Sequence, residues 1–503
     1  MREGLVFRVR CAAFLTLDPR EAGAVVPRFR QRSCLCCGRT AKGGSPVIES
    51  IATLNLHKIE TVSFVFDDMN LNLGYDQNDP NNPATRQLIF DYFQKEIEVD
   101  VRVAAEDDMY SYSLHLCGGR SIGTMAYFRA GLGIYDCIAE VARWKFGGLD
   151  KVNSFLDFAS GHGRVTRFLA TVCPKGTIWA SEILPDAVRF QRDVLGVNAI
   201  RSSTDPDDFN VDQKFDFIYV GSLFTHLPDR TFRRWLRKLY SLVNPEGLLA
   251  FSTHGLDHLK PDVTMPPEGL YFIPQTEVPS LNPQDYGASI VTDDYVKMAI
   301  LEVTGKPDHQ MNRKAIGFSQ DLWIISPTTL PKEPLRYDQG CQGHVDRTVW
   351  QSPKTLWLSG WASCIHPRHE TAYVEVLLNG VSAGKLKISF ARPDIARHLH
   401  DSTKGNSGWQ GIVRTHKEID PWRDVISVNG VCDGGKSTSL RTVLASSMIQ
   451  LPTEAQPVSS TGHRVPSNSS LTTRTKLHNA LDYICDGDWS RLFFNLANHL
   501  RGK

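Results

Sequence analysis

The middle of the chain alternates between short apolar runs and segments with helical periodicity. The apolar runs are bounded by turn residues, which is typical of buried strands. The clearest helical segment follows Asp229, a suitable N-cap residue. Its apolar positions are Phe232, Trp235, Leu236, Leu239, Leu242 and Val243. Alternating strands and helices predict a mostly parallel sheet with helices on both faces.

Seven segments between residues 120 and 328 supply the strands of this predicted sheet. They are Ser154–Phe158, Thr177–Ala180, a short strand near Ala199, Phe215–Val220, Leu248–Ser252, Ala288–Val291 and Leu322–Ile325. A helix with Ile134, Ile138 and Val141 on one face precedes the first strand. The sequence therefore predicts an α/β domain over residues 120–328, with a Rossmann-like seven-stranded sheet.

The pattern becomes all-β beyond the proline-rich segment 327–336, which is interpreted as a linker. Short apolar runs are separated by turn signals, and the dipeptides Asn379–Gly380 and Asn429–Gly430 are typical of hairpin turns. Residues 337–450 are therefore predicted to form a β-sandwich. Residues 451–475, rich in serine, threonine and proline, are expected to be a flexible linker. Residues 476–503 have the pattern of an amphipathic helix.

The first part of the chain has weaker patterns. Residues 1–50 are rich in arginine and glycine without a sustained period, so a basic and poorly ordered leader is expected. Charged residues interrupt every candidate apolar core in this leader, which is unlike a signal peptide. Residues 51–119 are interpreted as an accessory segment that precedes the α/β domain.

The balance of charge excludes some classes of partner. The chain has 56 basic and 55 acidic residues among 503, so electrostatics offer no case for binding nucleic acid. No apolar run approaches the ~20 residues that span a bilayer, so no membrane span is expected and a cytoplasmic location is predicted. The oligomeric state is left open by the sequence.

The cysteines do not predict a metal site. The chain has 11 cysteines, of which only Cys34, Cys36 and Cys37 lie close together in the sequence. A zinc site would need a fourth ligand, and no CxxC or HxxxH pair lies near them. Reduced thiols and no metal are therefore expected.

The segment from Asp157 to Gly163 joins the first strand to a helix that is expected from about Arg164. In an open α/β sheet, such a corner brings backbone N–H groups and a helix N-terminus against the polar groups of a ligand. A phosphate-binding loop would need Gly-Lys-Ser/Thr, whereas Arg164 follows Gly163. A dinucleotide site would need a third glycine where Thr166 stands. The corner therefore predicts a nucleotide-like ligand of another kind.

Acidic residues follow this corner at the ends of later elements. Glu182 closes the second strand, and an acidic cluster at Asp205–Asp208 precedes the fourth strand. The series resembles the class I S-adenosylmethionine-dependent methyltransferases over roughly residues 120–328. The resemblance rests on four segments in this order: Leu156–Arg164, Ala180–Val188, Phe215–Leu227 and Pro245–Phe251. It implies S-adenosylmethionine as the cofactor and methyl transfer as the activity.

The resemblance also implies roles for individual residues. Asp157 matches the strand-one carboxylate that lies near the ammonium group of the cofactor, directly or through water. Glu182 matches the acidic residue that accepts hydrogen bonds from both ribose hydroxyls, and Asp205 lies about where the adenine amino group is held. The remaining cofactor-binding residues that it implies are Ala159, Ser160, Gly161, Gly163, Gly221 and Tyr127, with Arg129 beside Tyr127 at the methionine end.

One departure from the family pattern bears on these roles. The family usually has glycine where this chain has Ala159, so the first small position of the loop carries a methyl group. The two glycines, Gly161 and Gly163, would let the backbone approach the cofactor without a Cβ clash. For each acidic residue, a turn cap or a solvated loop end is the alternative interpretation. A degenerate cofactor loop would leave a non-catalytic scaffold that binds S-adenosylmethionine.

Methyl transfer is an in-line displacement, so the enzyme mainly supplies alignment and dehydration of the nucleophile. A hydroxyl nucleophile would be helped by a general base at the strand ends. His226 follows the fourth strand and His254 follows the fifth, so these two are the candidate catalytic residues, with a structural role as the alternative. His162 is expected to orient the cofactor loop. No Asn-Pro-Pro-Tyr motif follows the fourth strand, which favours an oxygen acceptor.

The C-terminal region carries a second resemblance. The segments Leu358–Ala362, Ala391–Ala396 and Ser407–Trp409 resemble a β-sandwich appended to bacterial transferases of surface-polysaccharide pathways. This implies a small-molecule or glycan-linked acceptor and a role in polysaccharide biosynthesis. Trp361 and Trp409 are candidates for stacking on sugars, with a place in the core as the alternative. A carbohydrate-binding protein is the second reading of the whole chain.

Overall fold

The computed structural model describes residues 79–448, except for short gaps at 118–119, 175, 277, 279–280, 367–368 and 400. It also describes one antiparallel strand pair, β1 (Ala12–Ala13) with β2 (Phe64–Val65). The chain divides into two compact units, Met1–Asp76 and Gln77–Lys503, and the elements below belong to the second. The predictions for the leader, for the linker 451–475 and for the helix 476–503 fall outside the described residues.

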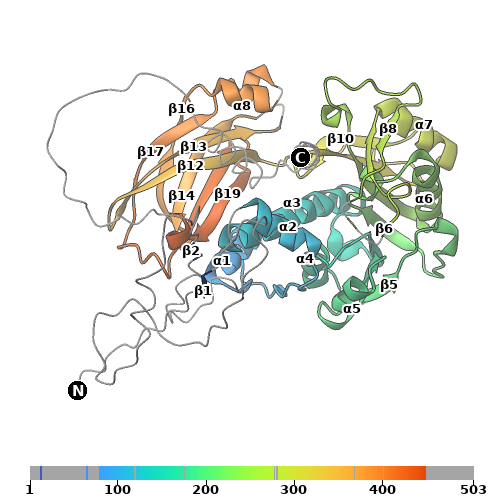
Figure 1. Cartoon of the computed structure of the whole chain (residues 1–503), viewed down its shortest axis with the longest axis horizontal. Coiled ribbons are helices and arrows are strands. Elements are labelled where there is room, and N and C mark those ends of the chain that lie inside the picture. The colour runs from blue at the N-terminus through green and yellow to red at the C-terminus, as the bar shows by residue number, and fades with distance from the viewer. Residues whose placement is uncertain are drawn as a thin grey trace, which may run out of the picture. The chain divides into compact units, whose positions relative to one another are not determined.

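A seven-stranded sheet forms the centre of the α/β domain (Figure 1), in the order β10-β11-β7-β6-β3-β4-β5. Its strands are β3 (Phe155–Phe158), β4 (Ile178–Glu182), β5 (Asn198–Arg201), β6 (Phe215–Val220), β7 (Val243–Thr253), β10 (Gln310–Ile316) and β11 (Gln320–Ile325). The strands from β7 to β5 are parallel, whereas β11 pairs antiparallel with both β7 and β10. The predicted mostly parallel sheet is confirmed.

Alternate side chains of the central strands enter two hydrophobic cores, one on each face of the sheet. In β3, Phe155 belongs to one core and Leu156 to the other, and both are fully buried. The helices α3 (Arg120–Phe146) and α4 (Thr166–Val172) contribute to the first core, and α6 (Asp229–Ser241) and α7 (Asp293–Thr304) to the second. The helix α5 (Pro185–Asp193) packs on β4 and β5. Helices thus cover both faces, as predicted.

Two local predictions need correction. The run Ala288–Val291 does not complete the sheet; it forms β9, which pairs with β8 (Leu270–Ile273) in a separate two-stranded sheet. The seventh strand of the large sheet is instead β10, which was not predicted because its composition is polar. Asp229 is the first residue of α6 rather than its N-cap, which is Pro228. Among the described helices, none has the length and apolar content that a bilayer crossing requires.

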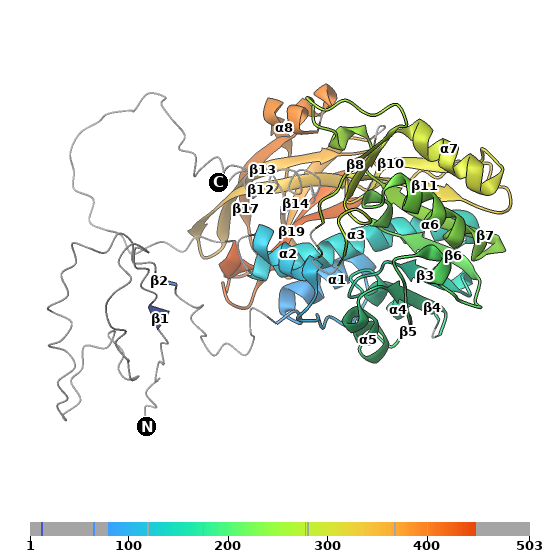
Figure 2. The same ribbon diagram turned by 45° about the vertical axis from the view of Figure 1, so that its right-hand side comes forward.

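Helices α1 (Pro83–Phe93) and α2 (Asp108–Leu116) extend the layer formed by α3. Both pack against α3, and α1 also contacts strand β19 (Ser437–Leu444) of the C-terminal domain. In consequence Leu88 of α1, Phe155 of β3 and Leu444 of β19 belong to one continuous hydrophobic cluster. Figure 2 shows α1, α2 and α3 between the large sheet and the C-terminal strands. We call this cluster the shared core.

The C-terminal domain consists of two four-stranded antiparallel sheets, β12-β13-β17-β16 and β15-β14-β18-β19. The strands other than β19 are β12 (Cys341–Ser352), β13 (Thr355–Cys364), β14 (Thr371–Leu378), β15 (Val381–Leu386), β16 (Ile388–Phe390), β17 (Gly408–Arg414) and β18 (Val425–Cys432). Residues from both sheets, such as Leu358, Val376 and Val428, fill one core between them. The predicted sandwich is confirmed, with a short helix α8 (Pro393–His398) after β16.

The two Asn-Gly dipeptides of this domain have different roles. Asn379–Gly380 joins β14 to β15 with φ values of 50° and 77°, as a two-residue hairpin turn requires. Asn429–Gly430, by contrast, lies inside β18, so the predicted hairpin there is wrong. Glycine is needed at this point because a Cβ on Gly430 would lie 2.6 Å from the Cβ of Cys341.

The described cysteines differ in state. Cys117 is disulfide-bonded, so the expectation of reduced thiols is wrong at this position. Cys137, Cys173, Cys341, Cys364 and Cys432 are buried free thiols.

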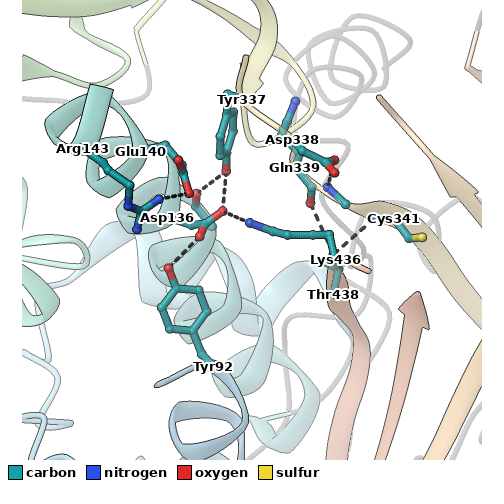
Figure 3. A network of polar contacts seen from close by, with 12 residues as sticks. Tyr92, Asp136, Glu140, Arg143, Tyr337, Asp338, Gln339, Cys341, Lys436 and Thr438 are labelled. Atoms are coloured by element: carbon teal, nitrogen blue, oxygen red, sulfur yellow. Dashed lines mark hydrogen bonds and ion pairs between the residues drawn. The ribbon is translucent and has the colours of Figure 1, made fainter. Parts of the chain in front are cut away.

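A polar network also links the sandwich to the α/β domain (Figure 3). Asp136 of α3 accepts hydrogen bonds from Tyr92 of α1 at 2.8 Å and from Tyr337 at 3.1 Å. Lys436, which follows β18, forms an ion pair of 2.7 Å with the same carboxylate. Burial, with the charge of Asp136, raises the pKa of the Tyr92 hydroxyl, which therefore stays protonated and donates. Three segments distant in the sequence thus meet on one carboxylate.

The Lys436→Met substitution is expected to lower the free energy of unfolding by about 2 kcal/mol, because it leaves the carboxylate of Asp136 without its counter-charge. The estimate is below the cost for fully buried pairs because the Lys436 side chain is 30% exposed. Urea unfolding should show the loss, and Asp136→Asn in the same chain should restore part of it. Equal losses in the Lys436→Met chain and in the double variant would contradict this role.

Candidate cofactor and catalytic site

The carboxyl ends of β3, β4, β6 and β7 meet at one edge of the sheet because these strands are parallel. Asp157 is in β3, Glu182 closes β4, Gly221 follows β6 and His254 follows β7. The structure therefore brings residues that were selected from separate sequence motifs to one edge. Ligands of open α/β sheets bind at this edge.

The turn after β3 uses the left-handed backbone region at three residues. The φ angles are 59° at Ala159, 57° at Gly161 and 79° at Gly163. Glycine adopts this region freely, whereas an L-residue such as alanine is disfavoured there by about 1–2 kcal/mol. The position of Ala159 thus has the conformation that suits glycine, and the alanine introduces strain rather than a change of path.

Ser160 fastens this turn to the neighbouring strand. Its backbone N–H and its hydroxyl both donate to the carbonyl oxygen of Ser181, at 3.2 Å each. The amide of Gln191 in α5 donates to the Ser160 hydroxyl and to the Gly161 carbonyl, at 2.8 Å each. The turn is therefore held from two sides.

The two glycines of the turn differ in what they face. A Cβ on Gly161 would have no heavy atom within 4 Å, so this residue presents an open backbone surface. A Cβ on Gly163 would lie 2.4 Å from a terminal methyl carbon of Leu195, so Gly163 packs closely against the segment that follows α5. Close approach of a ligand was predicted for both glycines, and the open surface that it requires is found at Gly161.

Glu182 is buried, with 8% of its surface exposed, and points to the turn. Its Oε2 accepts from the N–H of Gly161 at 2.8 Å, and its Oε1 accepts from Ile183 at 2.6 Å and from Leu184 at 3.3 Å. A carboxylate has about four acceptor positions, and these three bonds leave one of them for a ligand. Bonding to both ribose hydroxyls would need the release of one backbone bond.

Asp157 lies deeper, with 3% of its surface exposed, and its Oδ2 accepts from the hydroxyl of Thr166 at 2.7 Å. Removal from water raises the pKa of this carboxyl to about 7; the Thr166 bond opposes the rise and the nearby Glu182 adds to it. A cation placed beside Asp157 would favour its ionised form. The ammonium group of S-adenosylmethionine is such a cation.

Tyr219 is a candidate site residue that sequence reasoning missed. It is the register partner of Asp157 in β6, and its buried hydroxyl has no hydrogen-bond partner among the described residues. A Cβ on Gly221 would lie 2.9 Å from this hydroxyl oxygen, which explains why glycine follows β6. Burial raises the pKa of Tyr219 well above its ordinary value, so its hydroxyl stays a donor. Tyr219 lies in an apolar run, and this sequence pattern predicts only that its side chain is buried in the core.

Asp205 is the N-cap of the 3₁₀ turn Pro206–Asp208. Its Oδ1 accepts from the N–H of Asp207 at 2.9 Å and from the guanidinium of Arg234 at 2.5 Å. These contacts match the alternative interpretation of a turn cap. The role of Asp205 toward adenine stays a prediction.

Tyr127 and Arg129 of α3 contact different parts of the protein. Tyr127 is fully buried, and its hydroxyl donates to Asp107 at 2.6 Å. Arg129 donates to the carbonyl oxygen of Leu440 in β19. Complete burial lowers the pKa of Arg129 to about 10. Arg129 thus contacts the sandwich, and its expected role at the methionine end stays a prediction.

His226 is held in one orientation and one tautomer. Its Nδ1 lies 2.6 Å from the carbonyl oxygen of Gly287, and because a carbonyl only accepts, Nδ1 carries the proton. The ring stacks on Tyr286 with 4.6 Å between centroids. Burial lowers the pKa of His226, with the Gly287 bond acting against this shift. The imidazole is therefore neutral at pH 7, with its lone pair on Nε2.

His254 stacks on His258 with 4.1 Å between ring centroids. Burial lowers the pKa of His254 well below its ordinary value, and the neighbouring His258 and His226 lower it further. His258 itself contacts the carbonyl oxygen of Ser319 through Nε2 at 3.1 Å. The structure thus places a third histidine, His258, beside the two predicted ones. No pattern in the sequence indicated this grouping.

His162 lies inside the cofactor turn, as the sequence predicts, and faces α5. Its Nε2 is 3.0 Å from a carboxylate oxygen of Asp186, and its ring meets Phe190 edge-on. These contacts fit the predicted role of orienting the loop.

The described residues fit S-adenosylmethionine in three respects. Gly161 offers a backbone surface that a side chain would cover. Asp157 is a buried carboxyl without a cationic hydrogen-bond donor, and Glu182 keeps one acceptor position at the turn. The unpartnered hydroxyl of Tyr219 adds a donor beside Asp157. The donor set thus suits an ammonium group and a ribose.

Three comparisons show which known proteins this chain is similar to. A family model described as a methyltransferase domain matches residues 129–287. No curated protein matches the chain. Among solved structures, the chain is similar to the glycopeptide N-methyltransferase MtfA, with 14% identity and a TM-score of 0.26 over 35% of this chain and 83% of that chain.

Two further solved structures are similar at the same low level. The plantazolicin methyltransferase BamL, in complex with a triazolic desmethylPZN analog and SAH, has 12% identity and a TM-score of 0.31, over 49% of this chain and 97% of that chain. The N-terminal domain of EvdMO1, in the presence of SAH and D-fucose, has 13% identity and a TM-score of 0.29, over 38% of this chain and 82% of that chain.

The segment that the family model matches contains the Asp157–Gly163 turn, Glu182 and the loop after β6. It lies on the mostly parallel seven-stranded sheet with helices on both faces that the motifs predict. This part of the chain therefore matches a methyltransferase domain, as the resemblance to the S-adenosylmethionine-dependent methyltransferases implies.

Proposed function

We propose that the enzyme methylates a hydroxyl oxygen of a small-molecule or glycan-linked acceptor, with His226 as the general base. The fixed tautomer of His226 carries this proposal. The proton on Nδ1 is committed to the Gly287 carbonyl, so Nε2 is the atom that can take a proton from a nucleophile. A cytoplasmic location and a role in polysaccharide biosynthesis belong to the same proposal.

In the proposed reaction, residues of the chain have three roles. The turn Ala159–Gly163 with Asp157 and Glu182 would hold the donor at the sheet edge. His226 would accept the acceptor's hydroxyl proton at Nε2 while the oxygen attacks the methyl carbon in line. His254, whose pKa is lowered well below its ordinary value, stays neutral and would form an uncharged, hydrogen-bonding wall beside it. S-adenosylmethionine supplies the electrophilic methyl group when bound.

The test starts with labelled S-adenosylmethionine and fractionated cell-surface glycans, followed by analysis of the methylated atom. With an acceptor in hand, His226→Gln is expected to lower kcat by about 100-fold. Affinity for S-adenosylmethionine, measured by calorimetry, should stay unchanged. His416→Gln, at an exposed position of the sandwich, is the matched control.

The pH profile gives an independent check on His226. Wild-type kcat should fall on the acidic side as His226 becomes protonated, with a midpoint below the ordinary histidine value of about 6.5. The His226→Gln chain should lack this acidic limb. Methylation of a nitrogen atom, or an acidic limb retained in the variant, would contradict the proposal. Binding of the donor without turnover on any acceptor would favour the scaffold reading instead.

A further inference from the structure

Three buried thiols and a carboxylate meet at one end of the sandwich. The ligand atoms of Asp338, Cys364 and Cys432 all lie within 4.8 Å of one another. The Sγ of Cys341 is 3.4 Å from the Sγ of Cys432. Asp338 precedes β12, Cys341 begins it, and Cys364 and Cys432 are the last residues of β13 and β18. Four positions spread over the domain thus converge.

We propose that Cys341, Cys364, Cys432 and Asp338 form a structural zinc site. Tetrahedral zinc with Zn–S bonds of about 2.3 Å places its sulfur ligands roughly 3.8 Å apart. The 3.4 Å separation of Cys341 and Cys432 is near this value and far from the ~2.05 Å of a disulfide. Four protein ligands with no open position are typical of structural rather than catalytic zinc. Sulfur with one carboxylate oxygen is a donor set that zinc accepts and that calcium and magnesium do not.

The backbone around the thiols is shaped for their close approach. Gly430 faces Cys341, and any side chain there would push the thiol away. The turn after β18 is tight: the N–H of Cys432 donates to the carbonyl of Lys436, and the N–H of Gly435 donates to the carbonyl of Cys432, at 2.9 Å each. The Thr371 hydroxyl lies 3.6 Å from the sulfur of Cys341. The backbone bonds thus fix the position of Cys432, and the Thr371 hydroxyl is a polar neighbour of the Cys341 sulfur.

The location implies what the metal would do. Asp338 immediately follows Tyr337, and Lys436 is hydrogen-bonded to Cys432 through the backbone. Tyr337 and Lys436 both bind Asp136 of α3, as Figure 3 shows. A bound ion would fix both segments and with them the contact between the sandwich and the methyltransferase domain. The site is separate from the donor and acceptor residues described above.

The experiment measures metal in the full chain, purified under reducing conditions with added zinc sulfate. We expect about one zinc ion per chain that resists dialysis. Cobalt(II) in its place should give an intense thiolate-to-metal charge-transfer band. Cys364→Ser and Cys432→Ser should lose both signals. The matched control Cys173→Ser, and a chain with Cys34, Cys36 and Cys37 all replaced by serine, should keep both.

A second measurement uses the wild-type chain and therefore does not depend on whether the cysteine variants fold. A strong chelator should lower the Tm of the wild-type chain and leave its calorimetric affinity for S-adenosylmethionine unchanged, so this test is independent of the proposed methyl transfer. The proposal is overturned if the wild-type chain holds no zinc and shows no cobalt band. It is also overturned if mass spectrometry of the native chain finds Cys341 joined to Cys432 or Cys364 by a disulfide.

Discussion

The Asp157→Asn substitution is expected to weaken S-adenosylmethionine binding by about 100-fold and to stabilise the unliganded protein at pH 8. The first effect follows from the loss of the only charge that would face the ammonium group from β3, a buried pair whose disruption costs about 3 kcal/mol. The second follows from the environment of the carboxyl in the free enzyme. It is buried, and its one side-chain donor is the neutral hydroxyl of Thr166.

The pH dependence of this stabilisation has a definite sign. Burial raises the pKa of Asp157 to about 7 in the folded chain, from about 3.9 in the unfolded chain. Between these values the folded state binds more protons, so the wild-type stability falls as the pH rises through this window. Above pH 7 the ionised carboxyl costs up to about 4 kcal/mol, which the neutral asparagine avoids. At pH 4 the difference should vanish.

Thermal unfolding at pH 5 and pH 8, without donor, checks this prediction. The Tm of Asp157→Asn should exceed that of the wild type at pH 8, with a smaller difference at pH 5. Asp207→Asn is a suitable control because that carboxylate is exposed and pairs with Arg234 at the surface. Equal shifts at both pH values would contradict a buried titrating carboxyl, and unchanged donor affinity would contradict the ammonium contact.

The Trp409→Ala substitution is expected to destabilise the protein by about 3–5 kcal/mol and to leave no specific effect on acceptor binding. Trp409 has no exposed surface and lies in the sandwich core. Its ring fills the space over Gly360, where a Cβ would come within 2.5 Å of the indole. A side chain in this position cannot stack on a sugar, so the core alternative for Trp409 and for the equally buried Trp361 is correct.

Denaturant unfolding of the Trp409→Ala chain should show this loss. Trp357→Ala is the matched control, since Trp357 lies in β13 on the more exposed side, opposite Ile412. It is expected to change the free energy of unfolding by less than about 1.5 kcal/mol. A Trp409→Ala chain with wild-type stability but reduced affinity for a glycan would overturn the assignment to the core.

The sequence predicted those parts of the fold that depend on periodicity. Phe155 and Leu156 enter opposite cores because neighbouring residues of a strand face opposite sides, and the α6 pattern marks its buried stripe in the same way. The prediction for Ala288–Val291 failed because an apolar run indicates burial and not the pairing partner. Strand β10 shows the reverse case, since an edge strand pairs through its backbone and needs few apolar residues.

The sequence predicted those parts of the candidate site whose geometry is determined within a single motif. The strand–turn–helix corner and Glu182 depend on residues that lie near each other in the sequence or at equivalent strand ends. Tyr219 and the group of four proposed zinc ligands depend on pairing between distant strands. Gly430 illustrates the difference: next to Asn429 it predicts a hairpin, and only the packing of Cys341 explains it.

The shared core also decides where this chain can be divided. The proline-rich segment 327–336 has the composition of a linker, yet the apolar residues on its two sides belong to the same cluster. A shorter protein that ends there would expose Leu88 and its neighbours on α1 and α3 to water, where β19 now covers them. Composition therefore marks a boundary of secondary-structure class, while the hydrophobic core continues across that boundary.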